Sequence, residues 1–266
     1  MKKITLTTFL VVFLSVFTAC DVEPIDPVVN DYVPEDSGSG EEEGEEDGGG
    51  NNGGGSSAVG DYWPFAVNNE WTYEYAGNDT ENFDPMKIIG TEVINGKTYY
   101  RMNHYFQDSG TDDMTGTATI YLRKENGAYF QRTSVDIPDE NGIEITVSPY
   151  ELTVLKDLEV NQTWEESVVQ TTSYYFAGMT IPSFDMTINV KGTILEKGIT
   201  MTVAGETYTD VIKEKFEQTI NNDLLSTDPI VTVSYVWFAK NVGPIKTESV
   251  AGSLNYSMTL TSYTIN

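Results

Sequence analysis

The sequence has very little cysteine, histidine and positive charge. Its 266 residues include one cysteine, Cys20, and one histidine, His104, and 15 Lys and Arg stand against 41 Asp and Glu. A single cysteine excludes an intrachain disulfide and a metal site built from cysteines. The net charge of −26 argues against a nucleic-acid partner, because phosphate contacts need clustered cations.

Long apolar runs are also missing, and the most apolar stretch, residues 9–16, is too short to span a bilayer. This stretch follows Lys2 and Lys3 and precedes a region of small residues that ends at Cys20. A positive start, a short apolar centre and a small-residue cleavage region are typical of a secretory signal peptide. We therefore expect residues 1–19 to be a signal peptide.

The segment Phe17-Thr18-Ala19-Cys20 resembles a lipobox, in which a bacterial peptidase cuts before a diacylated cysteine. Phe17 departs from the usual Leu, Val or Ile of that pattern. The resemblance implies that Cys20 is the lipid-attachment residue and that its acyl chains make the membrane a partner. Two or three acyl chains would anchor the protein stably. The alternative is an ordinary secretory signal with a chance cysteine.

The segment after Cys20 is acidic and rich in glycine. Residues 21–58 contain 12 Asp and Glu and no Lys or Arg, with the run EEEGEED at residues 41–47. Such a composition buries too little apolar surface to offset the entropy of ordering the chain. We expect residues 20–58 to be a lipidated cysteine and a disordered tether, with a typical reach of about 35 Å.

From residue 59 onward the apolar residues recur with a period of two, which predicts half-buried strands. The clearest examples are residues 253–260 and residues 186–194, where we expect Gly192 to bend or bulge the strand. Tight hairpins are predicted at three Asn-Gly pairs and one Ala-Gly pair, namely 95–96, 126–127, 141–142 and 204–205. The first joins residues 92–94 with 97–105, and the second joins 118–123 with 128–135.

These patterns predict one all-β domain over residues 59–266. We expect about 10 to 13 antiparallel strands in a twisted sheet that forms an open or partly closed barrel, because such curling limits exposed edges. A weak internal repeat aligns residues 67–71 with 160–164 and residues 95–99 with 204–208. Two smaller tandem β units are therefore the alternative.

Two longer motifs bracket most of this domain. Residues 62–73, YWPFAVNNEWTY, resemble the YFPLxVGNxWxY opening of uncharacterised bacterial envelope lipoproteins, and residues 236–246, VWFAKNVGPIK, resemble their YFAKGVGLVK closing motif. Asn68 and Asn241 replace glycines of these patterns, and Pro244 replaces a Leu or Ile. The resemblance implies a β-rich twisted sheet or open barrel and brings no established activity or catalytic residue.

Residues that carry chemistry are few. His104 has no cysteine or second histidine in a motif around it, and no Gly-x-Ser-x-Gly elbow is present. Asp108, Asp112 and Asp113 share one segment, but their spacing fails the twelve-residue calcium loop. We therefore predict no catalytic residue, no metal and no cofactor, and we expect a protein that is not an enzyme.

Aromatic residues are the most suggestive feature, with 16 Tyr, 11 Phe and 4 Trp. Exposed rings can stack on flat ligands, and a lined barrel can hold an apolar one. In a β-domain most aromatic residues belong instead to the core or to cross-strand pairs. The candidate ligand contacts are the four tryptophans, Trp63, Trp71, Trp164 and Trp237.

The leading hypothesis is a membrane-anchored envelope lipoprotein that binds a glycan, a lipid or a protein without catalysis. Its alternatives are a carrier or chaperone of lipid-like molecules and a hydrolase that uses a close pair of carboxylates. The acidic residues after the cysteine, Asp21, Glu23 and Asp26, resemble export signals of lipoproteins on the outer membrane. We therefore expect attachment to the outer membrane, facing the exterior, although in other bacteria such an Asp retains the protein at the inner membrane.

Overall fold

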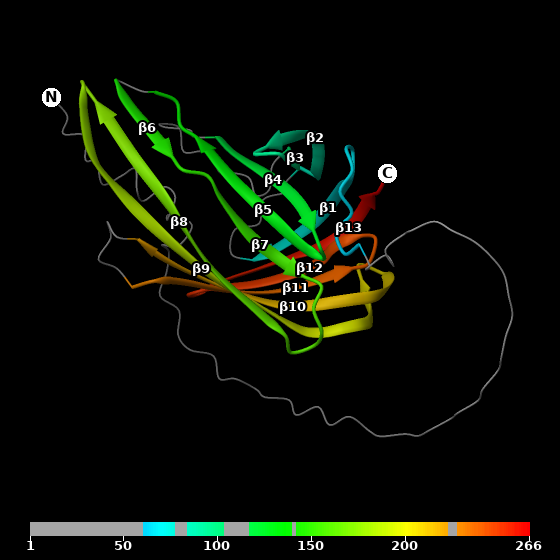
Figure 1. The fold of residues 1–266 in the computed structure, drawn as a ribbon. Helices are drawn as coiled ribbons and strands as arrows, with labels where there is room; N and C mark the ends of the chain where they lie inside the picture. Colours follow the sequence, from blue (N-terminus) through cyan, green and yellow to red (C-terminus); the bar gives the residue numbers. More distant parts are fainter. Residues whose placement is uncertain (1–60, 78–83, 104–116, 140–141, 223–227) are drawn as a thin grey trace, which may run out of the picture. The chain divides into compact units, whose positions relative to one another are not determined.

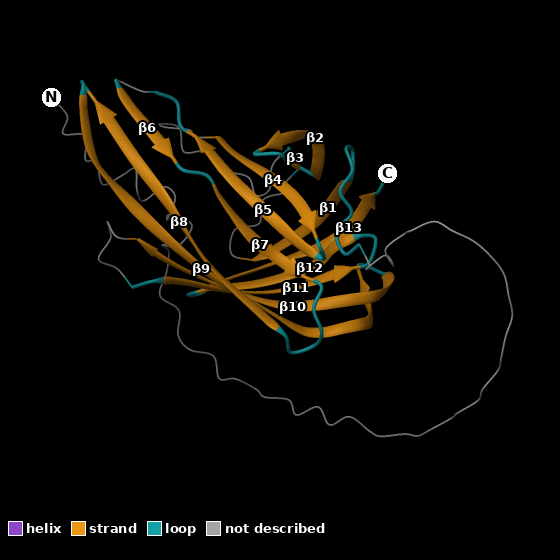
Figure 2. Cartoon of the chain, viewed as in Figure 1, coloured by secondary structure: helices purple, strands orange, loops and turns teal. Residues whose placement is uncertain are grey.

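The computed structural model describes residues 61–77, 84–103, 117–139, 142–222 and 228–266, and all regular structure in these ranges is β-strand (Figure 1, Figure 2). No helix in them is long and apolar enough to cross a membrane. The strands are β1 (Glu70–Gly77), β2 (Met86–Ile94), β3 (Lys97–Met102), β4 (Thr117–Glu125), β5 (Ala128–Asp136), β6 (Ile143–Val147), β7 (Tyr150–Lys156), β8 (Thr163–Phe176), β9 (Met179–Val203), β10 (Glu206–Asn222), β11 (Ile230–Ala239), β12 (Gly243–Ala251) and β13 (Leu254–Thr264).

All of these strands belong to one antiparallel sheet. Its order is β6-β8-β9-β10-β11-β12-β13-β1-β2-β3-β4-β5-β7. The sheet therefore consists of two successive meanders, β1 to β5 with β7 and then β8 to β13, which meet where β13 pairs with β1. The ladder begins at β6 and ends at β7 and does not close, so the predicted all-β class and open sheet are confirmed.

Three of the four predicted hairpins are confirmed. The turns between β2 and β3, β4 and β5, and β9 and β10 each place two consecutive residues at positive φ, in the pairs Asn95-Gly96, Asn126-Gly127 and Ala204-Gly205. Asparagine and glycine tolerate this left-handed conformation best, which is why an Asn-Gly pair signals a two-residue hairpin turn. Local turn chemistry thus pairs six of the thirteen strands that the structure describes.

One expectation about local structure is wrong, and of the bend or bulge expected at Gly192 the bulge is absent. The fourth predicted hairpin, at residues 141–142, is absent, because β6 after Gly142 pairs with β8 while β5 pairs with β7. Gly192 is not at a bulge, since it stays in register with both Trp164 and Phe216. A Cβ atom at Gly192 would lie 2.1 Å from the Trp164 ring. The glycine is therefore required by the close approach of an indole.

The internal repeat is visible in the hydrogen bonds. Asn68 N donates to Ile88 O, and Asn161 N donates to Ile194 O, at 2.8 Å in both cases. Asn69 N donates to Ala66 O, and Gln162 N donates to Glu159 O, so each bond closes a four-residue turn. The asparagine at the third position of each turn has a positive φ, 73° at Asn68 and 68° at Asn161. A type II turn needs such a residue at its third position. The two meanders therefore begin in the same way, but they form one sheet rather than separate units.

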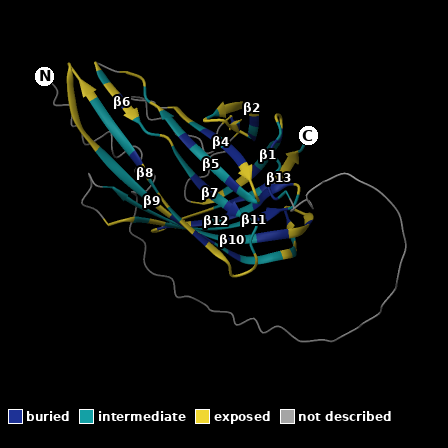
Figure 3. Cartoon of the chain, viewed as in Figure 1, coloured by how far each residue is buried: buried dark blue, intermediate teal, exposed yellow. Residues whose placement is uncertain are grey.

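The core lies on one face of the sheet, which we call the interior face. It contains residues from both meanders, and its largest fully buried members include Trp71, Ile88, Leu122, Leu155, Ile194, Ile245 and Leu260. A second, smaller cluster joins Leu152 of β7 to Ile188 and Val190 of β9. Figure 3 shows that burial decreases toward the far end of the β8–β9 hairpin.

Candidate functional site

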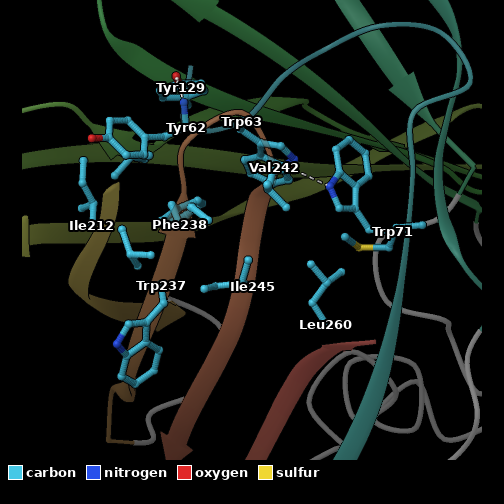
Figure 4. Packing of buried hydrophobic residues seen from close by; sticks show 14 of the residues in the cluster. Tyr62, Trp63, Trp71, Tyr129, Ile212, Trp237, Phe238, Val242, Ile245 and Leu260 are labelled. Carbon is cyan, nitrogen blue, oxygen red and sulfur yellow. Dashed lines mark hydrogen bonds between the residues drawn. The ribbon is translucent and has the colours of Figure 1, made fainter. Parts of the chain in front are cut away.

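The two long sequence motifs pack against each other. Trp63 lies 5.9 Å from Phe238 between ring centroids, and Trp71 Nε1 donates a hydrogen bond of 2.6 Å to Val242 O (Figure 4). Gly243, at φ 115°, leaves room for both indoles, because a Cβ there would lie 3.1 Å from an atom of each ring. The residues that carry the resemblance to envelope lipoproteins therefore pack against one another in the core.

The glycine replacements in these motifs are explained by the backbone. Asn68 and Asn241 have φ values of 73° and 62°, and each is the third residue of a turn closed by an i to i+3 hydrogen bond. Asparagine is the residue that best replaces glycine in this conformation. The turns of the pattern are therefore retained.

The four candidate tryptophans all belong to the main buried cluster. Trp63, Trp71, Trp164 and Trp237 are 2%, 0%, 5% and 8% exposed, so none of them forms an exposed platform. Trp237 lies apart from Trp63 and Trp71 in Figure 4, and the ammonium groups of Lys213 and Lys246 lie 5.1 and 5.2 Å from its ring centroid. Cation–π attraction and the lysine stems account for its burial. Ligand contact by these residues stays a prediction.

Several other candidates lie outside the described residues, namely Cys20, His104, Asp108, Asp112 and Asp113. Among the residues that are described, no group of three His, Cys, Asp or Glu side chains is arranged to hold a metal ion. The structure therefore neither places nor tests the predicted lipid attachment.

The structure reveals a buried carboxyl group that the sequence patterns did not single out. Glu214 of β10 is fully buried, and neither of its oxygens has a hydrogen-bond partner in the described part of the chain. Burial raises the pKa of this carboxyl well above its ordinary value. Glu214 takes a position between Ile212 and Phe216 in a series of alternate residues. A charged residue within a series of apolar alternate residues is the sequence signal that could have identified it.

Glu214 does not make a hydrolase site. Glycosidase chemistry needs two carboxyl groups across a cleft that admits substrate. Glu214 is closed off from solvent and has no hydrogen bond to a second carboxylate among the described residues. It is a single acid inside a core, beside Ile194 and Val236 in the ladder.

A surface of different character lies where the β8–β9 hairpin extends past the core. Ile143, Phe176 and Met179 are directly opposite one another on β6, β8 and β9, and so are Ile145, Tyr174 and Ile181. Residues opposite one another in an antiparallel ladder share a face. We call this surface the apolar end face, and it comprises Ile143, Ile145, Tyr174, Phe176, Met179, Ile181 and Phe184.

The apolar end face is partly open to solvent. Phe176, Met179 and Ile181 are 41%, 63% and 40% exposed, while Tyr174 stacks on Phe184 with centroids 5.8 Å apart. On β9 the same face continues from Phe184 through Met186 to the buried Ile188. The interior face thus extends from the core to solvent as an apolar surface. Contiguous exposed apolar residues of this kind are typical of binding surfaces.

Comparisons with known proteins give no function. No family model and no curated protein matches the sequence. Two crystal structures are similar, a proposed lipoprotein from Parabacteroides distasonis (TM-score 0.47, 13% identity) and a proposed exported protein with a YmcC-like fold from Bacteroides fragilis (TM-score 0.43, 12% identity). Each alignment covers 76% of this chain and 98% of the other. We therefore derive function from the residues of this chain alone.

Proposed function

We propose that this chain is a lipid-anchored envelope lipoprotein that binds a ligand on the apolar end face and has no enzymatic activity. Cys20 carries the acyl chains, residues 21–58 hold the domain away from the membrane, and the protein is attached to the outer membrane and faces the exterior. The observation that carries the binding proposal is the exposure of Phe176, Met179 and Ile181 on one face of a hairpin.

Support for the anchor comes from the sequence. The positive start, the apolar residues 9–16 and the lipobox-like residues 17–20 occur in the order that lipidation requires. Metabolic labelling with a palmitate analogue should modify the wild type and leave Cys20→Ala unlabelled. Protease treatment of intact cells should release the domain if it faces the exterior, and protection of the domain would contradict that location.

Support for binding comes from a contrast between the two faces of β8. Its interior-facing residues near the tip, Tyr174 and Phe176, continue an apolar surface across three strands. The opposite face carries Val169 and Tyr175, which are 51% and 46% exposed, and their register partners are Thr187 and Thr180. Only the interior side therefore offers a broad apolar surface.

A carrier of lipid-like molecules is the second candidate, because the apolar end face is continuous with the buried cluster around Ile188. Native mass spectrometry of protein purified from its own envelope addresses this candidate directly. A co-purifying lipid would favour the carrier, whereas a bare chain would favour binding of a protein partner on the same face.

The decisive experiment measures binding of a fluorescent fatty-acid probe. We expect Phe176→Ser with Met179→Ser to weaken binding at least about tenfold, since each buried apolar side chain contributes about 1.5–3 kcal/mol. The matched control is Val169→Ser with Tyr175→Ser, which removes equally exposed apolar side chains from the opposite face of the same strand. Equal losses in the two double variants would contradict a site on the apolar end face.

A further inference from the structure

A second surface follows from the placement of arginine. The sequence contains three arginines, Arg101, Arg123 and Arg132, and they lie on three neighbouring strands, β3, β4 and β5. Their strands form part of the first meander, far along the sheet order from the apolar end face. In residues 59–266, where 29 acidic residues face 13 basic ones for a net charge of −16, such a gathering of cations is unusual.

Arg123 is fully engaged within the protein. Its guanidinium makes a bidentate interaction with Glu151, with Nε 3.0 Å from Oε2, and also contacts Glu125 at 2.9 Å. The group also lies 3.7 Å from the centroid of Phe130. Both interactions suit the planar, delocalised guanidinium. Arg123 is therefore structural and binds no external group.

Arg101 and Arg132 are different. Neither makes an ion pair with any residue that the structure describes, and Arg132 Nε is buried without a hydrogen-bond partner there. Glu151 is the ladder partner of Arg132, but its carboxylate is already bound by Arg123 and by the Tyr99 hydroxyl, 2.6 Å from Oε2. The carboxylate nearest in the ladder is thus taken, and the Arg101 and Arg132 guanidinium groups keep unused donors within the described part of the chain.

The two free arginines flank an aromatic ring. Tyr121 of β4 is directly opposite Arg101 of β3 and directly opposite Arg132 of β5, so the three residues form one row on one face. Two strand spacings separate the arginine backbones by about 10 Å. Tyr121 is half-buried, and its hydroxyl donates to Glu92 Oε2 at 3.0 Å, which fixes the ring. We call Arg101, Tyr121 and Arg132 the arginine row.

We propose that the arginine row binds a carboxylated saccharide, independently of the ligand on the apolar end face. A guanidinium fork matches a carboxylate in a bidentate fashion, and the face of a tyrosine ring packs against a sugar ring. Two cations about 10 Å apart suit a chain that carries carboxylates at intervals along its length. An acidic peptide fits less well, because the row lacks the buried apolar anchors on which protein interfaces depend.

The test uses the full lipoprotein in nanodiscs and measures binding of galacturonic acid oligosaccharides by biolayer interferometry. Neutral galactose oligosaccharides and poly-glutamate are the comparison ligands. We expect binding of the acidic saccharide alone, and weaker binding as salt rises. Equal binding of the neutral sugar, or no binding of the acidic one, would overturn the proposal. Equal binding of poly-glutamate would indicate that the ligand is an acidic peptide and would also overturn the proposal.

Variants locate the site. We expect Arg101→Gln with Arg132→Gln to weaken binding of the acidic saccharide by about tenfold or more, since hydrogen bonds to charged groups contribute about 1.5–3 kcal/mol each. The control, Lys191→Gln with Lys240→Gln, removes one lysine from β9 and one from the turn between β11 and β12 and should leave binding unchanged.

The tyrosine separates stacking from charge. Tyr121→Phe keeps the ring and should retain binding, while Tyr121→Ser should reduce it with the charges intact. Thermal melts show whether each variant is folded. A folded double arginine variant that binds as well as the wild type would place the saccharide elsewhere and contradict the arginine row.

Discussion

The two meanders begin with the same turn and the same tryptophan, yet they end differently. Trp71 opens β1, and Trp164 opens β8, and each follows an asparagine at positive φ by three residues. The first three strands of the first meander have 8, 9 and 6 residues, whereas those of the second have 14, 25 and 17. The longer strands of the second meander extend past the core and supply the apolar end face. The turn and tryptophan shared by both meanders therefore stabilise the core, and the additional strand length of the second meander provides exposed surface.

The largest expected effect concerns the residue opposite each tryptophan. Met86 faces Trp71, but Gly192 faces Trp164, and a Cβ at Gly192 would lie 2.1 Å from that ring. We expect Gly192→Val to lower the free energy of unfolding by at least about 3 kcal/mol, because the indole must leave its place. Urea unfolding measures this difference.

The matched control is a glycine on the corresponding strand of the first meander. Gly90→Ala introduces a Cβ with nothing within 4 Å and should change stability by less than about 0.5 kcal/mol. Similar losses at Gly90 and Gly192 would mean that the close indole contact does not distinguish the two halves.

The tryptophans themselves should differ in importance. Trp71 Nε1 donates to Val242 O at 2.6 Å, whereas Trp164 Nε1 donates to Thr153 O at 3.4 Å. Trp71→Phe should therefore cost about 2–3 kcal/mol, since it leaves a buried carbonyl unsatisfied and removes ring volume, and Trp164→Phe should cost about 1 kcal/mol. Chemical unfolding of both variants ranks them, and the reverse order would contradict the greater importance assigned to the Trp71 hydrogen bond.

A third comparison concerns the residue two positions after each tryptophan. The Tyr73 hydroxyl donates to Pro244 O at 2.8 Å, while Glu166 accepts from the backbone N–H and the hydroxyl of Thr153 on β7. Glu166→Ala should cost about 1–2 kcal/mol, because it leaves an N–H on an edge strand without a partner. Hydrogen exchange should show faster opening at Thr153 in this variant, and unchanged exchange there would contradict the role given to Glu166.

The last comparison concerns Glu214, in the second meander, whose effect on stability depends on pH. Its raised pKa means that the folded state favours the protonated carboxyl. The stability gained is fully present below the ordinary carboxyl pKa and is lost as pH rises through the folded-state pKa. Glu214→Gln should therefore be more stable than the wild type at pH 8, with the difference vanishing near pH 4.

Thermal melts across this range measure the effect, and Glu206→Gln on the same strand is the exposed control. If both variants show the same pH profile, burial of the Glu214 carboxyl does not govern the pH dependence.

Sequence reasoning succeeded where the cause is local. Two Asn-Gly turns and one Ala-Gly turn were predicted from residues that favour tight hairpins, and period-two alternation indicated the strands. It failed where pairing partners are distant in sequence. The chain around residue 141 carries a hairpin signal, but β6 pairs with β8 because the apolar residues Ile143 and Ile145 continue the face of Tyr174 and Phe176.

The functional candidates show the same limit. Aromatic content pointed to the four tryptophans, and burial places them in the core. The apolar residues within 174–184 were a sequence signal for the apolar end face. Whether other strands cover this face depends on the arrangement of the whole sheet, which the local sequence does not show. The arginine row also depends on register, because Arg101, Tyr121 and Arg132 are separated in sequence and adjacent only across strands.

The pairing of β1 with β13 governs when this domain can fold. Glu70 pairs with Lys87 of β2 and with Thr264 of β13, so β1 meets its second partner only when the distant β13 is in place. Contacts between such distant residues slow folding, because a long loop must close before they form. The junction of the two meanders therefore completes the sheet only after both meanders are available.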